Sequence, residues 1–119
     1  MKTIVYLTLN KKNNKIYVGV HTTATPERFD GYLGCGVYRN NPSTYKRSKT
    51  AFQYAVNKYG PDAFVRMTIA VFDDVEQAYE LEEKIVNIDF IKRKDVYNMI
   101  VGGKMGPKFS KIVYQYDYN

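Results

Sequence analysis

Hydrophobic residues, mostly β-branched or aromatic, fill two short segments near the start of the chain, at positions 3–9 and 16–20. The run between them, NKKNNK, is polar and rich in asparagine, which is typical of a turn. The two segments therefore predict an antiparallel hairpin. Side chains alternate between the two faces of a strand, so any loop with an even number of residues places Tyr6 and Tyr17 on the same face.

The region that follows changes from loop to helix and then to strand. Residues 21–41 contain three glycines and no sustained period, which predicts a long loop. Thr50 and Gln53 have the spacing of a helix capping box, and apolar residues at 51, 52, 55, 56 and 59 mark one face of the helix that follows. Gly60 and Pro61 end that helix, and residues 65–72 predict a third strand.

A second helix is predicted from the acidic pair at 73 and 74, which can cap its start, to about residue 91. At about 100° per residue its apolar side chains form one stripe, and Glu82 lies in the middle of that stripe. The acidic residues at 76, 80 and 83 point the other way. An unpaired buried charge is costly, so Glu82 requires a metal ion or a cationic group; a salt bridge to an arginine is the purely structural alternative.

The composition limits the class of protein. A chain of 119 residues is enough for one domain with one core. Cys35 and His21 are its only cysteine and histidine, which excludes an internal disulfide and a structural zinc site and leaves oxygen ligands for any catalytic metal. No apolar run approaches the length of a membrane span, and no signal segment opens the chain. We expect a soluble intracellular protein in the cytoplasm, or in the host cytoplasm if a phage encodes it.

The charge distribution points to a polyanionic partner. The net charge is +6, and basic residues interleave with tyrosines between positions 37 and 66, which suits contacts with phosphates and stacking on bases. Positions 73–89 are instead strongly acidic, with seven acidic residues and one basic residue, Lys84. At Gly19 the missing side chain leaves room for a substrate backbone or marks a bulge. The nucleic-acid-binding candidates are Gly19, Arg39, Lys46, Arg47 and Lys49.

Several motifs follow one another in a definite order. They are IVY at 4–6, YVG at 17–19, an arginine in the next loop, NKYG at 57–60, a third strand, LExxIV at 81–86 and YN at 97–98. With this order the chain resembles the GIY-YIG endonuclease domain across about residues 1–103. DGYLGCG at 30–36 and FQYAVNKYG at 52–60 are most similar to the phage and homing-type members. The first motif lacks the leading glycine, and the second has a valine, a conservative change in a strand.

The resemblance implies an α+β fold with a small three-stranded antiparallel sheet flanked by helices. It also implies a monomeric, divalent-metal-dependent endonuclease that hydrolyses phosphodiester bonds in double-stranded DNA without a small-molecule cofactor. Tyr17 would be the general base, with Tyr6 beside the same water or phosphate. A free phenol has a pKa of about 10, so a nearby cation must stabilise its phenolate. Glu82 would bind that cation, Mg²⁺ or Mn²⁺, together with waters.

Further roles follow from the resemblance or from position in the chain. Arg28, in the loop after the second motif, would stabilise charge on the phosphate, although Arg39 and Arg47 compete for this role. Asn98 would orient substrate or backbone near the metal. His21 would relay a proton or contact phosphate, with an exposed loop histidine as the alternative.

Residues 104–119 are predicted to be a short extension after the domain. The run KIVYQYD at 111–117 resembles the opening of the modular DNA-binding motifs that follow homing-nuclease domains, so we expect a catalytic fragment of a longer enzyme; an edge strand of this domain is the alternative. Two other functions stay open. A non-catalytic nucleic-acid-binding module would keep the fold without the chemistry, and a protein-interaction domain would use the acidic helix.

Overall fold

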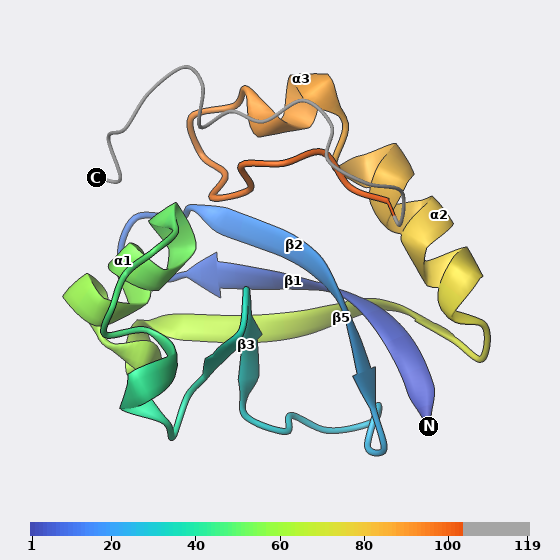
Figure 1. Ribbon diagram of the computed structural model, residues 1–119, viewed down its shortest axis with the longest axis horizontal. Coiled ribbons are helices and arrows are strands. Elements are labelled where there is room, and N and C mark those ends of the chain that lie inside the picture. The colour runs from blue at the N-terminus through green and yellow to red at the C-terminus, as the bar shows by residue number, and fades with distance from the viewer. Residues whose placement is uncertain (104–119) are drawn as a thin grey trace.

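A computed structural model describes residues 1–103. At its centre lies a three-stranded antiparallel sheet in the order β2-β1-β5, with β1 at Lys2–Asn10, β2 at Ile16–Thr23 and β5 at Phe64–Phe72. In Figure 1, α1 lies at the end of the sheet where β5 begins and α2 at the end where β5 finishes. The α+β class and the three strands predicted from the sequence are confirmed.

The hairpin of β1 and β2 has the register that brings the two motif tyrosines together. Thr8 lies opposite Tyr17 and Tyr6 lies opposite Gly19. Eight residues, an even number, separate Thr8 from Tyr17, so Tyr6, Thr8 and Tyr17 share one face of the sheet. The ring centroids of Tyr6 and Tyr17 are 6.3 Å apart. The prediction that both phenols lie on the same face is confirmed.

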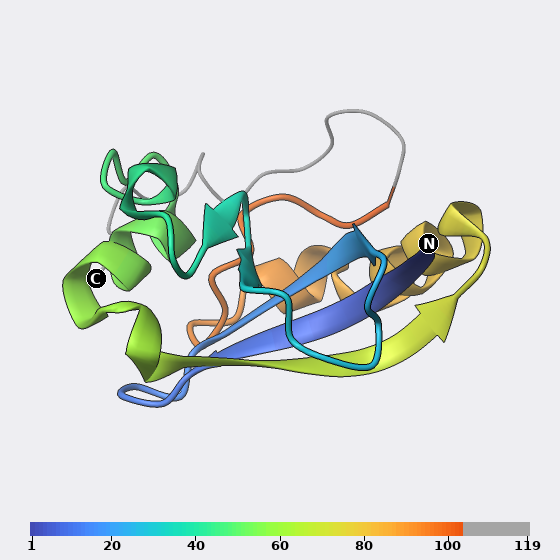
Figure 2. The same cartoon turned by 90° about the horizontal axis from the view of Figure 1, so that it is seen from below.

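This tyrosine face is covered by α1 (Ala51–Tyr59) and by a small two-stranded sheet of β3 (Tyr32–Gly34) and β4 (Val37–Tyr38). Figure 2 shows the segment with β3 lying to one side of the long strands. The hydroxyl of Thr8 donates to the carbonyl of Leu33 at 2.6 Å and fixes β3 to β1. The prediction of a loop throughout residues 21–41 is therefore wrong, because strands of two and three residues are too short to show a period.

Helix α1 begins where its capping residues predict. The Thr50 hydroxyl oxygen accepts a hydrogen bond from the N–H of Gln53 at 3.1 Å. The Gln53 side chain accepts from the N–H of Lys49 and donates to the carbonyl of Cys35, which ties the turn between β3 and β4 to the helix. Single turns of 3-10 helix lie on either side of α1, at Pro42–Thr44 and Pro61–Ala63.

The opposite face of the sheet packs against α2 (Val75–Ile85) and α3 (Ile88–Ile91). A single helix to about residue 91 is predicted, and this is wrong. Val86 leaves helical geometry, and the side chain of Asn87 accepts from the N–H of Phe90 and so caps a separate helix. The apolar residues of the core on this face are Val5, Val18, Ala78, Val86 and Ile91.

After α3 the chain returns along the edge of β2. The N–H of Ile16 donates to the carbonyl of Asp95 at 2.9 Å, and the N–H of Tyr97 donates to the carbonyl of Ile16 at 2.7 Å. These two bonds and the bridge between Ile16 and Val96 fix this segment to the start of β2. In residues 1–103 there is no helix with the length and apolar character needed to cross a membrane. The extension at 104–119 and its motif at 111–117 lie outside the described residues.

Candidate active site

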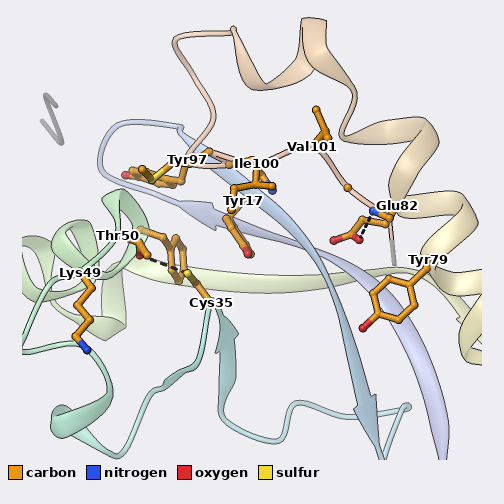
Figure 3. Close-up of a pocket in the computed structure, with 14 residues that line it drawn as sticks. Tyr17, Cys35, Lys49, Thr50, Tyr79, Glu82, Tyr97, Ile100 and Val101 are labelled. Atoms are coloured by element: carbon orange, nitrogen blue, oxygen red, sulfur yellow. Dashed lines mark hydrogen bonds between the residues drawn. The ribbon is translucent and has the colours of Figure 1, made fainter. Parts of the chain in front are cut away.

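A cavity of about 450 Å³ opens between α1, α2, β2 and the segment 97–103. Its lining combines phenols, one carboxylate, one amine, one amide, a hydroxyl, a thiol and apolar side chains. It includes Tyr17, Cys35, Lys49, Thr50, Phe52, Tyr79, Glu82, Tyr97, Asn98, Met99 and Ile100. Figure 3 shows the side chain of Tyr17 projecting between Cys35 on one side and Glu82 on the other. Strand β2 and helix α2, which are distant in sequence, thus contribute to one site.

Tyr17 is the central phenol of this cavity. Its ring packs against Phe52 of α1, with the ring centroids 5.0 Å apart. Burial raises the pKa of the Tyr17 phenol well above its usual 10.0, and charge on Cys35, Tyr32 and Glu82 acts in the same direction. Without a cation nearby, Tyr17 therefore stays protonated at neutral pH. A role as general base requires a positive charge in the cavity.

Tyr6 lies behind Tyr17 and is 1% exposed. Burial also raises the pKa of its phenol well above 10.0, with Tyr17 as the next largest cause. A Cβ on Gly19 would lie 2.5 Å from the Tyr6 hydroxyl oxygen and 3.1 Å from the ring of Tyr17. Gly19 therefore makes room for the two rings. The sequence suggests a different reason for this glycine, contact with a substrate backbone. The nucleic-acid contact of Gly19 stays a prediction.

Glu82 supplies the only carboxylate among the described residues that line the cavity. Its Oε1 accepts a hydrogen bond from the N–H of Gly103 at 3.0 Å. Within residues 1–103 no group of three or more His, Cys, Asp and Glu side chains could hold a metal. Mg²⁺ keeps several waters and binds one or two carboxylates together with substrate phosphates. The single carboxylate of Glu82 beside the Tyr17 phenol fits a metal held in this way.

Asn98 is 5% exposed and lies directly beside β2. Its side chain accepts from the N–H of Val18 at 3.0 Å and donates to the carbonyl of Val18 at 2.8 Å. Both polar atoms of the amide are thus bonded to the backbone next to Tyr17. Of the two roles predicted for Asn98, orienting backbone and orienting substrate, the geometry favours the first.

The arginine predicted to stabilise the phosphate does not line this cavity. Arg28 lines a separate hollow of about 590 Å³, and Arg39 lies in the same hollow. Arg39 also donates to Asp62 at 2.6 Å. Neither arginine is brought beside Tyr17 in this structure.

The other predicted basic residues precede α1. Lys46 and Arg47 are exposed, and Lys49 is exposed and also lines the cavity. Lys49 lies immediately before Thr50, the residue that caps α1, so its charge is close to the positive end of the helix dipole. Of these three basic residues, Lys49 is the one that the fold brings to the lining of the cavity.

His21 belongs to a hydrogen-bonded network with Asp30 on the same face of the sheet as Tyr17. Its Nε2 lies 2.7 Å from Asp30 Oδ2, and Arg66 donates to Asp30 Oδ1 at 3.0 Å. The ring of His21 stacks on Tyr32, with the ring centroids 4.1 Å apart. The alternative prediction, that His21 is an exposed loop residue, is therefore wrong, since His21 lies on β2 and its side chain is 13% exposed. It is not in the lining of the cavity.

Three residues that the structure places at or near the site were not identified from the sequence. The side chain of Arg66 is 3% exposed and lies above the rings of Tyr6 and Phe29. Alternation in β5 could have identified it, because Arg66 lies between the exposed Val65 and Met67 and so faces the opposite side. Tyr79 also lines the cavity. It lies three residues before Glu82 on the same helix, and this spacing predicts that the two side chains are neighbours. The sequence gives no comparable signal for Cys35, which reaches the cavity through the turn between β3 and β4.

We expect Asp30→Asn to lower the free energy of unfolding at pH 7 by about 2 kcal/mol, because the buried Arg66 loses its carboxylate partner. Burial by itself would raise the pKa of Asp30, but hydrogen bonds from His21, the backbone of Tyr32 and Thr23 hold it well below the usual 3.8. A carboxyl whose folded pKa is lowered stabilises the protein fully above the unfolded pKa and loses that contribution as the pH falls.

The difference between Asp30→Asn and the parent should therefore shrink when urea unfolding is measured at pH 3 instead of pH 7. Asp62→Asn is the matched control, since it removes an exposed partner of Arg39 and should change stability by less than about 0.5 kcal/mol. Equal losses in the two variants, or a difference independent of pH, would contradict the role assigned to Asp30.

Comparison with known proteins identifies relatives of this chain. The family described as the GIY-YIG catalytic domain matches residues 2–88. The protein named "Putative endonuclease segB" of Enterobacteria phage T4 is 40% identical over 101 residues, which cover 85% of this chain and 39% of that protein. "Endonuclease segA" of the same phage is 32% identical over 101 residues, which cover 85% of this chain and 39% of that protein.

This chain thus spans about 39% of the length of both of these relatives. No solved structure shows a significant match to it. The matched family region covers both tyrosine motifs, the two long helices and Glu82. The chain belongs to the GIY-YIG family.

Proposed function

We propose that this chain is the catalytic domain of a divalent-metal-dependent endonuclease that cleaves double-stranded DNA. The observation that carries the proposal is the shared cavity of Tyr17 and Glu82, which come from a strand and a helix far apart in the sequence. A phenol and a carboxylate at one cavity can supply the general base and the metal ligand for metal-assisted phosphodiester hydrolysis. Membership of the GIY-YIG family supports the same reaction.

In this reaction the phenolate form of Tyr17 takes a proton from a water molecule while that water attacks the phosphorus atom, and the phenol later returns this proton to solvent. The bond from phosphorus to the 3′-oxygen breaks, the 3′-oxygen takes a proton from solvent, and the products carry a 5′-phosphate and a 3′-hydroxyl. A Mg²⁺ or Mn²⁺ ion bound by Glu82 would supply positive charge that favours the phenolate and stabilises the phosphate oxygens. Tyr6, buried behind Tyr17, would keep the Tyr17 ring in place.

The basic residues would hold the DNA backbone. Lys49, in the lining of the cavity, would contact the phosphate next to the scissile bond, aided by the start of α1. Lys46 and Arg47 would extend this contact along the strand. Arg28 would reach the scissile phosphate only after its loop moves, since it lines a separate hollow with Arg39.

His21 would act indirectly. Its bond to Asp30 and its stack on Tyr32 suit a residue that orders the loop carrying β3, and this loop also carries Cys35 into the cavity. A proton relay through His21 would need a path to Tyr17 that the described contacts do not include. We therefore assign His21 to the support of the site.

The test is nicking of a supercoiled plasmid by this chain with Mg²⁺, with Mn²⁺ and with EDTA. We expect conversion to the open circular form with either metal and no conversion with EDTA. DNA ligase should then reseal the nicks, since it requires a 5′-phosphate beside a 3′-hydroxyl. Binding of DNA without metal-dependent nicking would overturn the proposal and favour a non-catalytic nucleic-acid-binding module.

A further inference from the structure

The segment after Asn98 returns to the carboxyl end of α2 and touches the helix at Glu82. The N–H of Val86 donates to the carbonyl of Glu82 at 2.7 Å and closes the last turn of α2. The N–H of Gly102 donates in turn to the carbonyl of Val86 at 2.7 Å. Gly102 thus satisfies one of the carbonyls that the end of a helix leaves without an intrahelical partner.

Gly102 lies so close to Glu82 that no side chain fits between them. A Cβ on Gly102 would lie 2.6 Å from the carbonyl oxygen of Glu82, and 2.9 Å from both its carbonyl carbon and its Cγ. Two of these atoms belong to the helix backbone, so rotation of a side chain cannot relieve the contact. Any larger residue at 102 must push the segment away from α2.

Gly103 holds the carboxylate of the same residue. Its N–H donates to Glu82 Oε1 at 3.0 Å, and its φ of 111° lies in the region that favours glycine. The close approach of Gly102 and the backbone geometry of Gly103 together bring this N–H to the carboxylate. Two successive glycines therefore contact Glu82 at its backbone and at its acid group.

We infer that Gly102 and Gly103 are positioning residues that fix the direction of the Glu82 carboxylate for metal binding. This inference rests on the proposed function. A glutamate has three side-chain torsions, and Glu82 is the only acid among the described lining residues, so no neighbouring carboxylate could compensate for a misdirected one. Residues that orient a metal ligand are commonly worth about 10-fold to 100-fold in metal affinity.

The test compares Gly102→Ala and Gly103→Ala with the parent. Isothermal titration calorimetry with Mn²⁺ gives the dissociation constant without DNA, and the nicking assay gives the Mn²⁺ concentration for half-maximal rate. We expect both quantities to rise by about 10-fold or more, while the rate at saturating Mn²⁺ stays close to that of the parent. Loss of folding alone would not produce this separation of metal requirement from maximal rate.

Gly60→Ala is the matched control. Gly60 has a φ of 84°, so alanine there meets similar backbone strain, but no atom lies within 4 Å of its added Cβ and it is not in the cavity lining. It should keep the Mn²⁺ affinity of the parent. Circular dichroism and thermal unfolding of each variant identify any that does not fold; if Gly102→Ala is unfolded, Gly103→Ala decides the question.

Folded glycine variants with the Mn²⁺ affinity of the parent would overturn the inference. Failure of the proposed function gives a different result, because the parent itself would then not nick DNA with any metal. Weaker Mn²⁺ binding in both glycine variants of an inactive parent would retain the positioning role and reject the endonuclease.

Discussion

Replacement of Glu82 by glutamine should reduce metal-dependent nicking at least about 1,000-fold at millimolar Mg²⁺. Glutamine keeps the shape of the side chain and an oxygen that can accept the N–H of Gly103, so the end of α2 should stay folded. It removes the only negative charge among the described lining residues, and with it the main attraction for a divalent cation. The measurement is the initial rate of plasmid nicking with the protein in excess over DNA.

The effect of Glu82 on the pKa of Tyr17 separates two explanations of this result. The charge of Glu82 is one of the causes that raise the pKa of the Tyr17 phenol, so its removal would by itself make Tyr17 easier to deprotonate. If a metal were not needed, Glu82→Gln would therefore be as active as the parent or more active. A large loss of activity is the result expected if Glu82 binds the metal, and partial recovery at high Mn²⁺ is expected for the same reason.

Glu83→Gln is the matched control for this variant. Glu83 is the next residue on α2, is exposed and is not part of the cavity lining. The same change of charge on the same helix should leave the rate within about twofold of the parent. Comparable losses at 82 and 83 would mean that the general charge of the helix matters and not a metal at one carboxylate.

Tyr17→Phe should lower the rate of nicking by about 100-fold to 10,000-fold, the usual contribution of a general base. Phenylalanine keeps the packing against Phe52 and removes only the hydroxyl that faces the cavity. Affinity for Mn²⁺ should change little, because Glu82 is intact. This combination, normal metal binding with a slow reaction, distinguishes Tyr17→Phe from Glu82→Gln.

The dependence of rate on pH provides a second test of Tyr17. Burial raises the pKa of its phenol well above 10.0, and in the proposed reaction the deprotonated form is the active one. Below that pKa the rate in the parent should rise about tenfold per pH unit, and a bound cation should shift the plateau to lower pH. Tyr17→Phe should show no such rise over the same range.

Tyr59→Phe controls for the loss of a phenol at a distance from the site. Tyr59 packs against the core of the tyrosine face and is not in the cavity lining. It should retain the rate and the pH dependence of the parent. If the pH dependence persisted in Tyr17→Phe, another group would be the base, and Tyr17 would serve only to fill the cavity.

What the sequence by itself determined is local. The period of two in the strands places Tyr6 and Tyr17 on one face, and the period of 3.6 in the second helix places Glu82 beside Ala78 and Val86. The spacing of Thr50 and Gln53 predicts the start of α1. These features depend on backbone geometry within a few residues, which is why they follow from pattern alone.

Which of the predicted residues share one cavity was decided only by the tertiary structure. Packing of α2 against the sheet brings Glu82 to the cavity of Tyr17, while the loop after β2 leaves Arg28 in another hollow and brings Asp30 to Arg66. No repeating pattern in the sequence relates these residues, because the distances between them in space depend on how the loops close and how the side chains fill the core. The glycines at 102 and 103 are the clearest case, since the reason for them is an approach to Glu82 that only the folded chain contains.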